Sequence, residues 1–197
     1  LLFTFAGQLG YAGMNSVGMA HFANALYNCP WRQGLPHYPL KRVALEQTTF
    51  DGIRKVIGEN PTCSAGNMVM CDGQDGILDV EIRADGVAEF TDDRPDAILH
   101  TNHYLASEFQ MHEDGHLKDS FARLERIRKL VHARYGEITV DVMKEILADH
   151  EGDPAGICRH GERGMHSVSG YIAEPAEGVL HVRRGHGCTG TWKAYEV

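Results

Sequence analysis

Two histidines flank an asparagine in residues 97–105, which read Ala-Ile-Leu-His-Thr-Asn-His-Tyr-Leu. This stretch opens with an apolar run that suits a buried strand and then changes abruptly to polar side chains. An asparagine amide at a strand end can donate a hydrogen bond into a pocket without changing its own charge. An oxyanion that develops during acyl transfer requires such a donor, so Asn102 is a candidate catalytic residue. The alternative interpretation is a strand that simply runs into a polar loop.

A second group, residues 112–116, has the letters of the zinc-hydrolase motif H-E-x-x-H. The motif works only on a helix, where residues four apart share a face and both imidazoles reach one ion. Here the two middle residues are Asp-Gly, which favour a turn, and no third ligand follows at a fixed spacing. A solvated loop is therefore favoured. A zinc-dependent hydrolase using His112, Glu113 and His116 stays the least favoured of three possible functions, and the other two are given below. We predict no bound metal and no cofactor.

The elements that must position Asn102 are predicted to be mainly strands in the first half of the chain. Residues 13–20 form a tight turn that enters a buried strand, and Asn24 lies near the far end of that strand. Residues 30–39 are interrupted by three prolines and predict a loop. Apolar runs separated by Gly or Asp-Gly turns predict strands at 1–5, 19–26, 67–71, 77–82 and 87–90.

Helical periodicity appears in three further places. These helices are expected to be capped by Thr48 or Thr49, by Asp119 or Ser120, and by Thr139. Strands at 167–173, 179–182 and 192–197 complete the chain. Blocks of strands separated by helices indicate an α+β layered domain with antiparallel sheets.

The composition excludes several classes of function. A chain of 197 residues can bury a sizeable core and predicts a single domain over residues 1–197. Nineteen basic against 27 acidic residues give a net charge of −8, which argues against nucleic acids and anionic membrane surfaces as partners. No apolar run approaches the length of a transmembrane helix. Five cysteines without paired spacing argue against a disulfide framework and favour a reducing, cytoplasmic location.

Several segments, in a consistent order, resemble the acyl-CoA:6-aminopenicillanic-acid acyltransferase family of N-terminal-nucleophile hydrolases. Residues 13–19, Gly-Met-Asn-Ser-Val-Gly-Met, with 23–26, Ala-Asn-Ala-Leu, are similar to the family's G-M-N-x-x-G-(L/M)…x-N-x-L segment. Residues 100–105 are similar to its H-T-N-H-(F/Y)-L stretch, and residues 119–126 resemble its D-S-x-x-R helix start. The ordered set is more specific than any one piece. The last part of the chain also fits, at Ser167-Val168-Ser169, Ile172, Glu174-Pro175, Trp192 and Tyr195.

The resemblance implies a four-layer αββα sandwich and acyl transfer, or amide or thioester hydrolysis, through a cysteine released by self-cleavage of a precursor. It implies that the amide of Asn102 and the main-chain N–H of Asn24 stabilise the oxyanion. Arg123 would lie near the nucleophile and favour its thiolate form. The substrate would be a small acyl-amide or acyl-thioester, with acyl-CoA as a substrate rather than a cofactor. As alternatives, Asn24 could satisfy backbone groups at a strand end, and Arg123 could belong to a solvated basic helix face.

The nucleophile of the family lies upstream of the Gly-Met-Asn turn, and residue 1 of this chain is a leucine. None of the five cysteines occupies an N-terminal position, and nothing beside Cys71 or Cys188 in the sequence suggests a lowered thiol pKa. We therefore expect the chain to be the larger, C-terminal part of the domain, without the nucleophile hairpin and inactive alone. Its partner would then be the missing N-terminal segment or an N-terminal fragment chain. The runner-up function is a non-catalytic ligand-binding member of the same fold.

Overall fold

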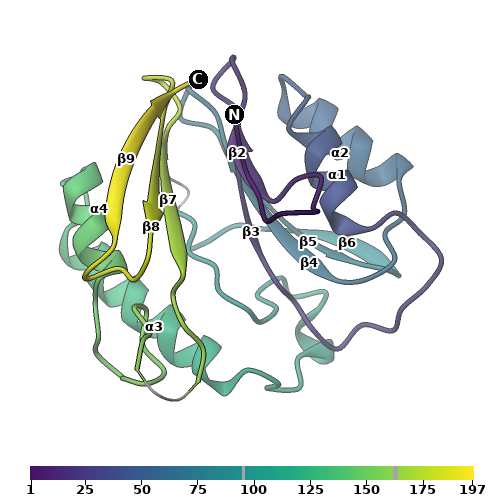
Figure 1. Cartoon of the computed structure of the whole chain (residues 1–197). Coiled ribbons are helices and arrows are strands. Elements are labelled where there is room, and N and C mark those ends of the chain that lie inside the picture. Colours follow the sequence, from purple (N-terminus) through teal and green to yellow (C-terminus); the bar gives the residue numbers. More distant parts are fainter. Residues whose placement is uncertain (95, 162–163) are drawn as a thin grey trace. The chain divides into compact units, whose positions relative to one another are not determined.

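A computed structural model describes residues 1–94, 96–161 and 164–197 (Figure 1). The chain divides into two compact units. The first unit comprises Leu1–His116, Ala173–Val179 and Val197, and the second comprises Leu117–Ile172 and Leu180–Glu196. The single domain expected over residues 1–197 stays a prediction.

The first unit is built on an antiparallel sheet with the strand order β1-β2-β3-β4-β5-β6. Strands that neighbour each other in this sheet also follow each other in the sequence. The expected strands at 19–26, 67–71, 77–82 and 87–90 are confirmed as β3 to β6. The bounds are β1 (Leu2–Phe3), β2 (Ala12–Met14), β3 (Ala20–Asn24), β4 (Gly66–Cys71), β5 (Ile77–Arg83) and β6 (Gly86–Phe90).

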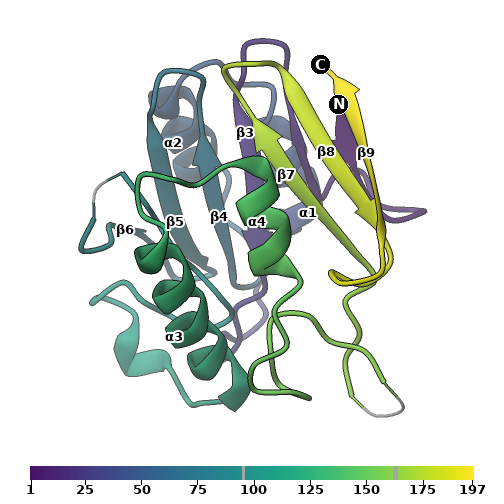
Figure 2. The same ribbon diagram turned by 90° about the vertical axis from the view of Figure 1, so that its left-hand side faces the viewer.

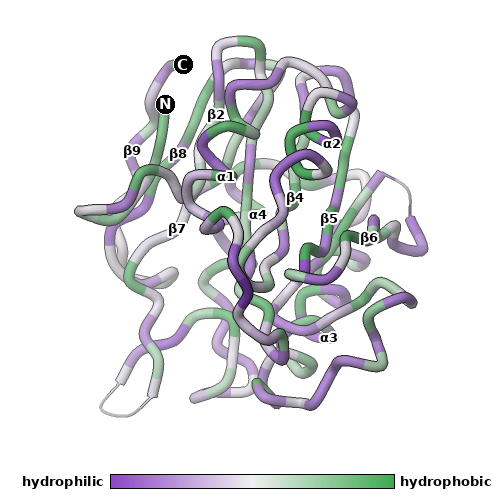
Figure 3. Tube along the Cα trace, turned by 90° about the vertical axis from the view of Figure 1, so that its right-hand side faces the viewer, coloured by the Kyte–Doolittle hydropathy of each residue, from purple (hydrophilic) through white to green (hydrophobic). Residues whose placement is uncertain are grey.

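Helices α1 (His37–Ala44) and α2 (Phe50–Glu59) pack on one face of this sheet. The Thr49 hydroxyl accepts a hydrogen bond from the backbone N–H of Gly52 at 3.1 Å, which confirms the expected cap of α2. In Figure 3 both hydrophobic and hydrophilic residues colour this helix, as expected when one side of it faces a core. The core beneath consists of Met19, Leu40, Ala44, Ile53, Ile57, Met68, Met70, Leu78, Val80 and Ile82.

The loop predicted for residues 30–39 is wrong at its end, because α1 begins at His37. Pro36 precedes the helix in an extended conformation, and Pro39 lies in its first turn. A proline is tolerated there because the first N–H groups of a helix have no intrahelical acceptor. Two prolines that read as helix breakers therefore mark a helix start.

The strand predicted at the start of residues 97–105 is also wrong. The described residues between Ala97 and Phe109 form neither strand nor α-helix, and a single turn of 3-10 helix, η1 (Gln110–His112), follows them. A strand needs a neighbour that supplies hydrogen bonds along its edge. Side-chain contacts from β5 hold this segment instead.

The second unit combines α3 (Lys118–Ala133) and α4 (Val140–Leu147) with most of a three-stranded sheet. The sheet has the order β7-β8-β9, with β7 (Ser169–Glu174), β8 (Val179–Arg184) and β9 (Thr191–Glu196) running antiparallel (Figure 2). Thr139 caps α4 as expected, since its hydroxyl accepts from the N–H of Val142 at 3.3 Å.

The expected cap of α3 is wrong, because the helix begins one residue before Asp119 and its N-cap, Leu117, makes no side-chain capping bond. The carboxylate of Asp119 forms ion pairs with Arg123, at 3.0 Å, and with Arg159. Two guanidinium groups therefore engage this carboxylate in charge-assisted bonds.

The fold is thus mixed α/β with two antiparallel sheets and four α-helices among the described residues, which confirms the predicted class at that level. Across the same residues, every helix is too short or too polar to cross a membrane.

Candidate functional site

The side chain of Asn15 holds the Gly-Met-Asn turn in place through four hydrogen bonds. The side-chain oxygen of Asn15 accepts from the N–H groups of Val17, at 3.1 Å, and Met19, at 2.9 Å. Its amide nitrogen donates to the carbonyl oxygens of Leu45, at 3.0 Å, and Gln47, at 2.8 Å. The motif asparagine therefore joins the β2–β3 turn to the connection between α1 and α2, and it fixes where β3 begins.

At the far end of β3, polar side chains form a row across the sheet. The register aligns Asn24 with Asn67 on β4, and Asn67 with Glu81 on β5. Since side chains alternate along a strand, these residues lie on the face opposite the helices. The amide nitrogen of Asn24 donates to the side-chain oxygen of Asn67 at 2.9 Å, and Asn67 in turn donates to Asp79.

The row continues into the segment that carries Asn102, through the fully buried carboxylate of Glu81. This carboxylate accepts from Nε2 of His100 at 2.9 Å and from the backbone N–H of Leu105 at 2.6 Å. It also accepts from the N–H of Ala106 at 3.3 Å. Glu81 thus fixes the segment on both sides of Asn102 and is a positioning residue for it.

Asn102 itself lies beside the end of β3. Its amide nitrogen donates to the carbonyl oxygen of Ala25 at 3.1 Å, across 77 residues of sequence. The structure therefore brings together the two sequence motifs that contain Asn24 and Asn102. The bond from Asn24 to Asn67 involves the side chain of Asn24. The proposed oxyanion donor is its main-chain N–H, and that role stays a prediction.

Burial is the largest single influence on the pKa values in this polar row. It raises the pKa of Asp79 to about 6, against the lowering effects of His100 and Asn67. Burial alone would lower the pKa of His100, but the hydrogen bond to Glu81 and the charges of Asp79 and Glu81 outweigh it, so this pKa is raised. Two buried carboxylates thus face one imidazole that favours its protonated form.

The sequence did not reveal these buried acids. Strand β5 alternates apolar and acidic residues at Leu78, Asp79, Val80 and Glu81, a pattern that normally places the acids in water. Here the second face is covered as well, by a cluster around Tyr104 and Phe109. The one sequence signal is His100, which directly follows an apolar run and is therefore expected to be buried beside an acid.

Arg123 belongs to the second unit, where it forms the ion pair with Asp119 already described. Its side chain is 15% exposed, so the alternative of a fully solvated face does not fit it. Burial lowers the pKa of Arg123, and the charge of Arg159 acts in the same direction. The role of Arg123 beside a nucleophile stays a prediction.

The zinc-hydrolase interpretation of residues 112–116 is not favoured. His112 ends the 3-10 turn and the backbone of Glu113 is extended, so the residues do not share a helix face. The Glu113 carboxylate accepts from the N–H groups of Tyr104, at 3.0 Å, and Gly115, at 2.8 Å. The His116 ring lies against Tyr27, with 4.7 Å between ring centroids. The Asp-Gly turn keeps these residues from forming the helix that the motif requires, as the sequence indicates.

A cavity of about 780 Å³ lies at the other end of β3, away from Asn24. The Asn15–Met19 turn, the start of α2 and the turn at 72–74 line it, together with residues 175–178. Its one lining arginine, Arg54, already pairs with Glu89 at 2.7 Å and with Asp51 at 3.0 Å. This cavity and the Asn24–Asn102 region are therefore separate features of the first unit.

The first unit also buries a lysine. Lys41 on α1 is 7% exposed, and its ammonium lies 5.2 Å from the ring centroids of both Tyr11 and Tyr38. Burial lowers its pKa to about 8. Aromatic faces stabilise the charged form of this amine while burial opposes it.

Side chains that could hold a metal converge in the second unit, at a place that the sequence did not reveal. They are His150, Cys158, His160 and Cys188. Among the described residues, these are the His, Cys, Asp or Glu side chains that gather in a group of three or more with neighbouring ligand atoms.

Comparison with known proteins gives two findings. The profile of the family described as acyl-coenzyme A:6-aminopenicillanic acid acyl-transferase matches residues 2–180. The acyl-coenzyme A:6-aminopenicillanic-acid-acyltransferase 40 kDa form of Emericella nidulans is 28% identical over 165 residues, which are 83% of this chain and 46% of that relative. The chain thus spans less than half the length of this curated relative.

Proposed function

Because the chain belongs to the acyl-coenzyme A:6-aminopenicillanic acid acyl-transferase family, we propose that it is the oxyanion-stabilising part of an acyl-transferring enzyme. In this proposal the thiolate of a cysteine attacks the carbonyl of an acyl-amide or acyl-thioester, which releases the amine or thiol and leaves a thioester on the cysteine. An amine or water then attacks this thioester, takes the acyl group and frees the cysteine. The side-chain amide of Asn102 and the main-chain N–H of Asn24 donate to the tetrahedral oxyanion. Arg123 favours the thiolate of the nucleophile.

The observation that carries this proposal is the bond from Asn102 to the carbonyl of Ala25. It holds the amide next to the residue whose N–H is the second proposed donor. Catalysis of this kind depends on donors that are already in place before charge develops. The three bonds to Glu81 supply that rigidity, because they hold the ring of His100 before Asn102 and two backbone N–H groups after it.

The nucleophile in this proposal comes from outside residues 1–197. The thiol of Cys71 is a poor candidate, since burial and the charge of Asp72 raise its pKa to about 11. Cys63 is buried beside the start of β4, and Cys29 accepts a hydrogen bond from the N–H of Ala84. Cys158 and Cys188 lie in the group with His150 and His160 described above. We also propose that the fold is the four-layer αββα sandwich that the resemblance implies, in one domain.

The test uses the full-length protein that contains this chain, assayed with acyl-CoA thioesters and N-acyl amides. We expect release of CoA or amine, and an acyl adduct on a cysteine detectable by intact mass. Asn102→Ala should lower kcat by about 100-fold to 1000-fold, because one oxyanion donor is lost. Asn60→Ala is the control, since Asn60 donates to the carbonyl of Val56 within α2 and lies outside the site.

Two results would overturn the proposal. The first is a folded full-length protein that binds these substrates without turning them over, which would favour the ligand-binding alternative. The second is an unchanged kcat in Asn102→Ala.

A further inference from the structure

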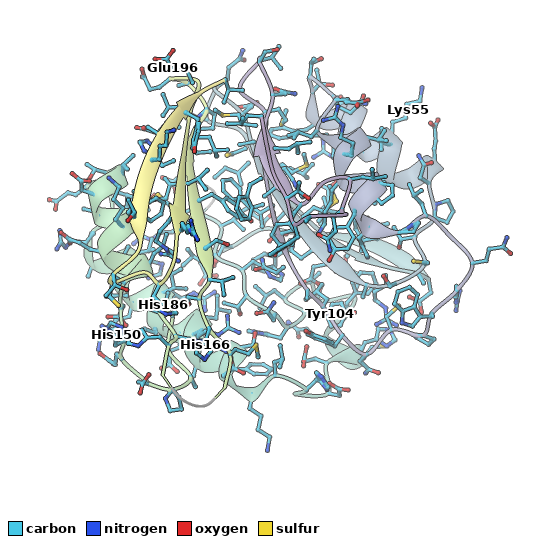
Figure 4. The ribbon with its side chains drawn as sticks, in the orientation of Figure 1. Lys55, Tyr104, His150, His166, His186 and Glu196 are labelled. Carbon is cyan, nitrogen blue, oxygen red and sulfur yellow. The ribbon has the colours of Figure 1, made fainter. Side chains whose placement is uncertain are left out.

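Four side chains of the second unit bring metal-ligand atoms together. The ligand atoms of His150, Cys158, His160 and Cys188 all lie within 4.8 Å of one another. Nε2 of His150 lies 2.9 Å from Nε2 of His160, and Sγ of Cys188 lies 3.4 Å from the same nitrogen. Figure 4 labels His150, together with His166 and His186, at one end of this unit.

We infer that these four side chains form a tetrahedral zinc site. Zinc–sulfur bonds of about 2.3 Å and zinc–nitrogen bonds of about 2.0 Å place the ligand atoms of a tetrahedron roughly 3.3 to 3.8 Å apart. The observed separations, 2.9 and 3.4 Å with an upper bound of 4.8 Å, surround that range. Two imidazoles and two thiolates suit zinc, and the thiolates balance its charge. Calcium and magnesium prefer oxygen ligands.

The backbone that carries His150 is fixed by its neighbours in sequence. The guanidinium of Arg126 on α3 binds both carboxylate oxygens of Asp149, at 2.9 and 2.5 Å, and the carboxylate of Glu151 at 2.7 Å. The carbonyl of Asp149 accepts from the N–H of Cys158 at 2.9 Å. This last bond ties the segments of the first two ligands together.

The backbone that carries His160 is held in the same way. The N–H of Arg159 donates to the hydroxyl of Ser167 at 3.0 Å, and the N–H of Ser167 donates back to the carbonyl of Arg159 at 2.9 Å. The side chain of Arg159 binds the carbonyl of Gly156 at 3.0 Å and the carboxylate of Asp119. Ligands on a backbone held this firmly lose little freedom when an ion binds.

The fourth ligand lies in the β8–β9 turn, which is closed by the N–H of Gly190 donating to the carbonyl of His186 at 2.7 Å. A Cβ at Gly187 would overlap the carbonyl oxygen of Leu147, so the turn lies directly against the end of α4. Nδ1 of His186 bonds to the carbonyl of Ser167 at 2.9 Å, and its ring lies 5.0 Å from that of His160. Cys188 is thereby placed beside the histidines.

Four protein ligands leave no open position for substrate, so the proposed ion is structural. It joins the end of α4, the loop that follows, and the β8–β9 turn, three segments that share no continuous secondary structure. Its binding free energy therefore adds to the stability of this unit. The competing arrangement is a disulfide between Cys158 and Cys188, both of which are free thiols here.

The first test is metal binding by the full-length protein that contains this chain, reduced, freed of metal by a chelator and titrated with zinc. We expect about one zinc per chain, protection of two thiols from alkylation, and a rise in the melting temperature. Cobalt in place of zinc should give the intense visible bands of tetrahedral thiolate coordination. Substoichiometric zinc, or a Cys158–Cys188 disulfide in the natural protein, would overturn the inference.

The second test uses variants. Cys188→Ala and His150→Ala remove exposed ligands, and both should lose the stoichiometric zinc and the cobalt bands. His166→Ala and Cys71→Ala are matched controls, since neither residue belongs to the ligand group, and both should keep one zinc. Circular dichroism of the metal-free proteins checks that each variant folds. Full zinc binding by Cys188→Ala would contradict the site, and the wild-type cobalt spectrum decides the matter if a variant fails to fold.

Discussion

Two polar clusters of this chain contrast in how they satisfy their atoms. In the first unit the Glu81 carboxylate faces donors: the ring of His100 and two backbone N–H groups. In the second unit each meeting atom of His150, His160 and Cys188 can donate a proton or offer a lone pair, depending on its protonation. The first cluster pairs donors with a carboxylate acceptor, whereas the second can exchange its protons for a cation.

Exposure separates the two clusters as well. The side chains of Glu81 and His100 are 0% and 1% exposed. In the second cluster Cys158 is buried and the other three ligands are exposed. Perturbing the first cluster should therefore change the stability of the fold, and perturbing the second should change metal binding first. The first and last of the following predictions test that difference, and the middle one concerns a further buried histidine of the first unit. They run from the largest effect to the smallest.

Replacing Glu81 by alanine should have the largest effect. It leaves a buried imidazole and two buried N–H groups without their acceptor, which costs about 3–5 kcal/mol of unfolding free energy. Glu89→Ala is the matched control on the neighbouring strand, because Glu89 forms a half-exposed pair with Arg54. That pair is worth about 1 kcal/mol or less. Urea unfolding of both variants measures the difference, and equal midpoints would show that the Glu81 cluster is not the closed network described.

Acid should destabilise the first unit through His21, which is 1% exposed. Burial, aided by the charge of Lys41, lowers the pKa of His21 from 6.5 to about 3. Below pH 6.5 His21 binds a proton in the unfolded chain but stays neutral in the folded chain. The free energy of unfolding therefore falls progressively between pH 6.5 and 3. Lowering the pH from about 6.5 to about 5 should cost about 2 kcal/mol.

His21→Leu should flatten this part of the pH dependence of unfolding, measured by urea titration at several pH values. His166→Leu, at an exposed position of the second unit, should keep the wild-type slope. If His21→Leu and wild type lose the same stability between these pH values, another group is responsible.

The smallest expected effect concerns Arg126, which contacts the residues on both sides of His150 but no ligand atom. Arg126→Ala should weaken zinc binding about 10-fold, at the lower end of what outer contacts to metal ligands contribute. Competition with a chromophoric chelator measures it. Arg134→Ala removes an exposed pair with Glu145 and should leave zinc affinity unchanged. Equal affinity in the two variants would mean that the ligands do not depend on this scaffold.

Much of the fold could be predicted where local chemistry decides it. Thr49 and Thr139 cap helices because their hydroxyls reach N–H groups three residues later, an interaction within one turn. Most strands of the first sheet follow from runs of apolar residues between turns, but β2 (Ala12–Met14) overlaps the segment predicted as a turn. Residues 97–105 failed as a strand because hydrogen bonds to the buried Glu81 carboxylate hold this segment, and a local pattern does not contain such a long-range contact.

The candidate site divides in the same way. The motif order indicated Asn102 and Asn24, and the structure places their segments in contact. Glu81 was missed because an acid that alternates with apolar residues reads as a solvent-facing position. The second cluster was missed because its ligands, His150 to Cys188, follow no regular spacing, and only the folding of the β8–β9 turn onto α4 brings them together.

Lys41, between Tyr11 and Tyr38, supplies a built-in reporter for the first unit. With its pKa near 8, about half of its amines are uncharged, and hence nucleophilic, in mildly alkaline buffer. While α1 is packed on the sheet, the rings of Tyr11 and Tyr38 shield this amine from reagents. The rate at which an amine-reactive label modifies this one side chain would therefore record how often α1 lifts from the sheet, without any engineered probe.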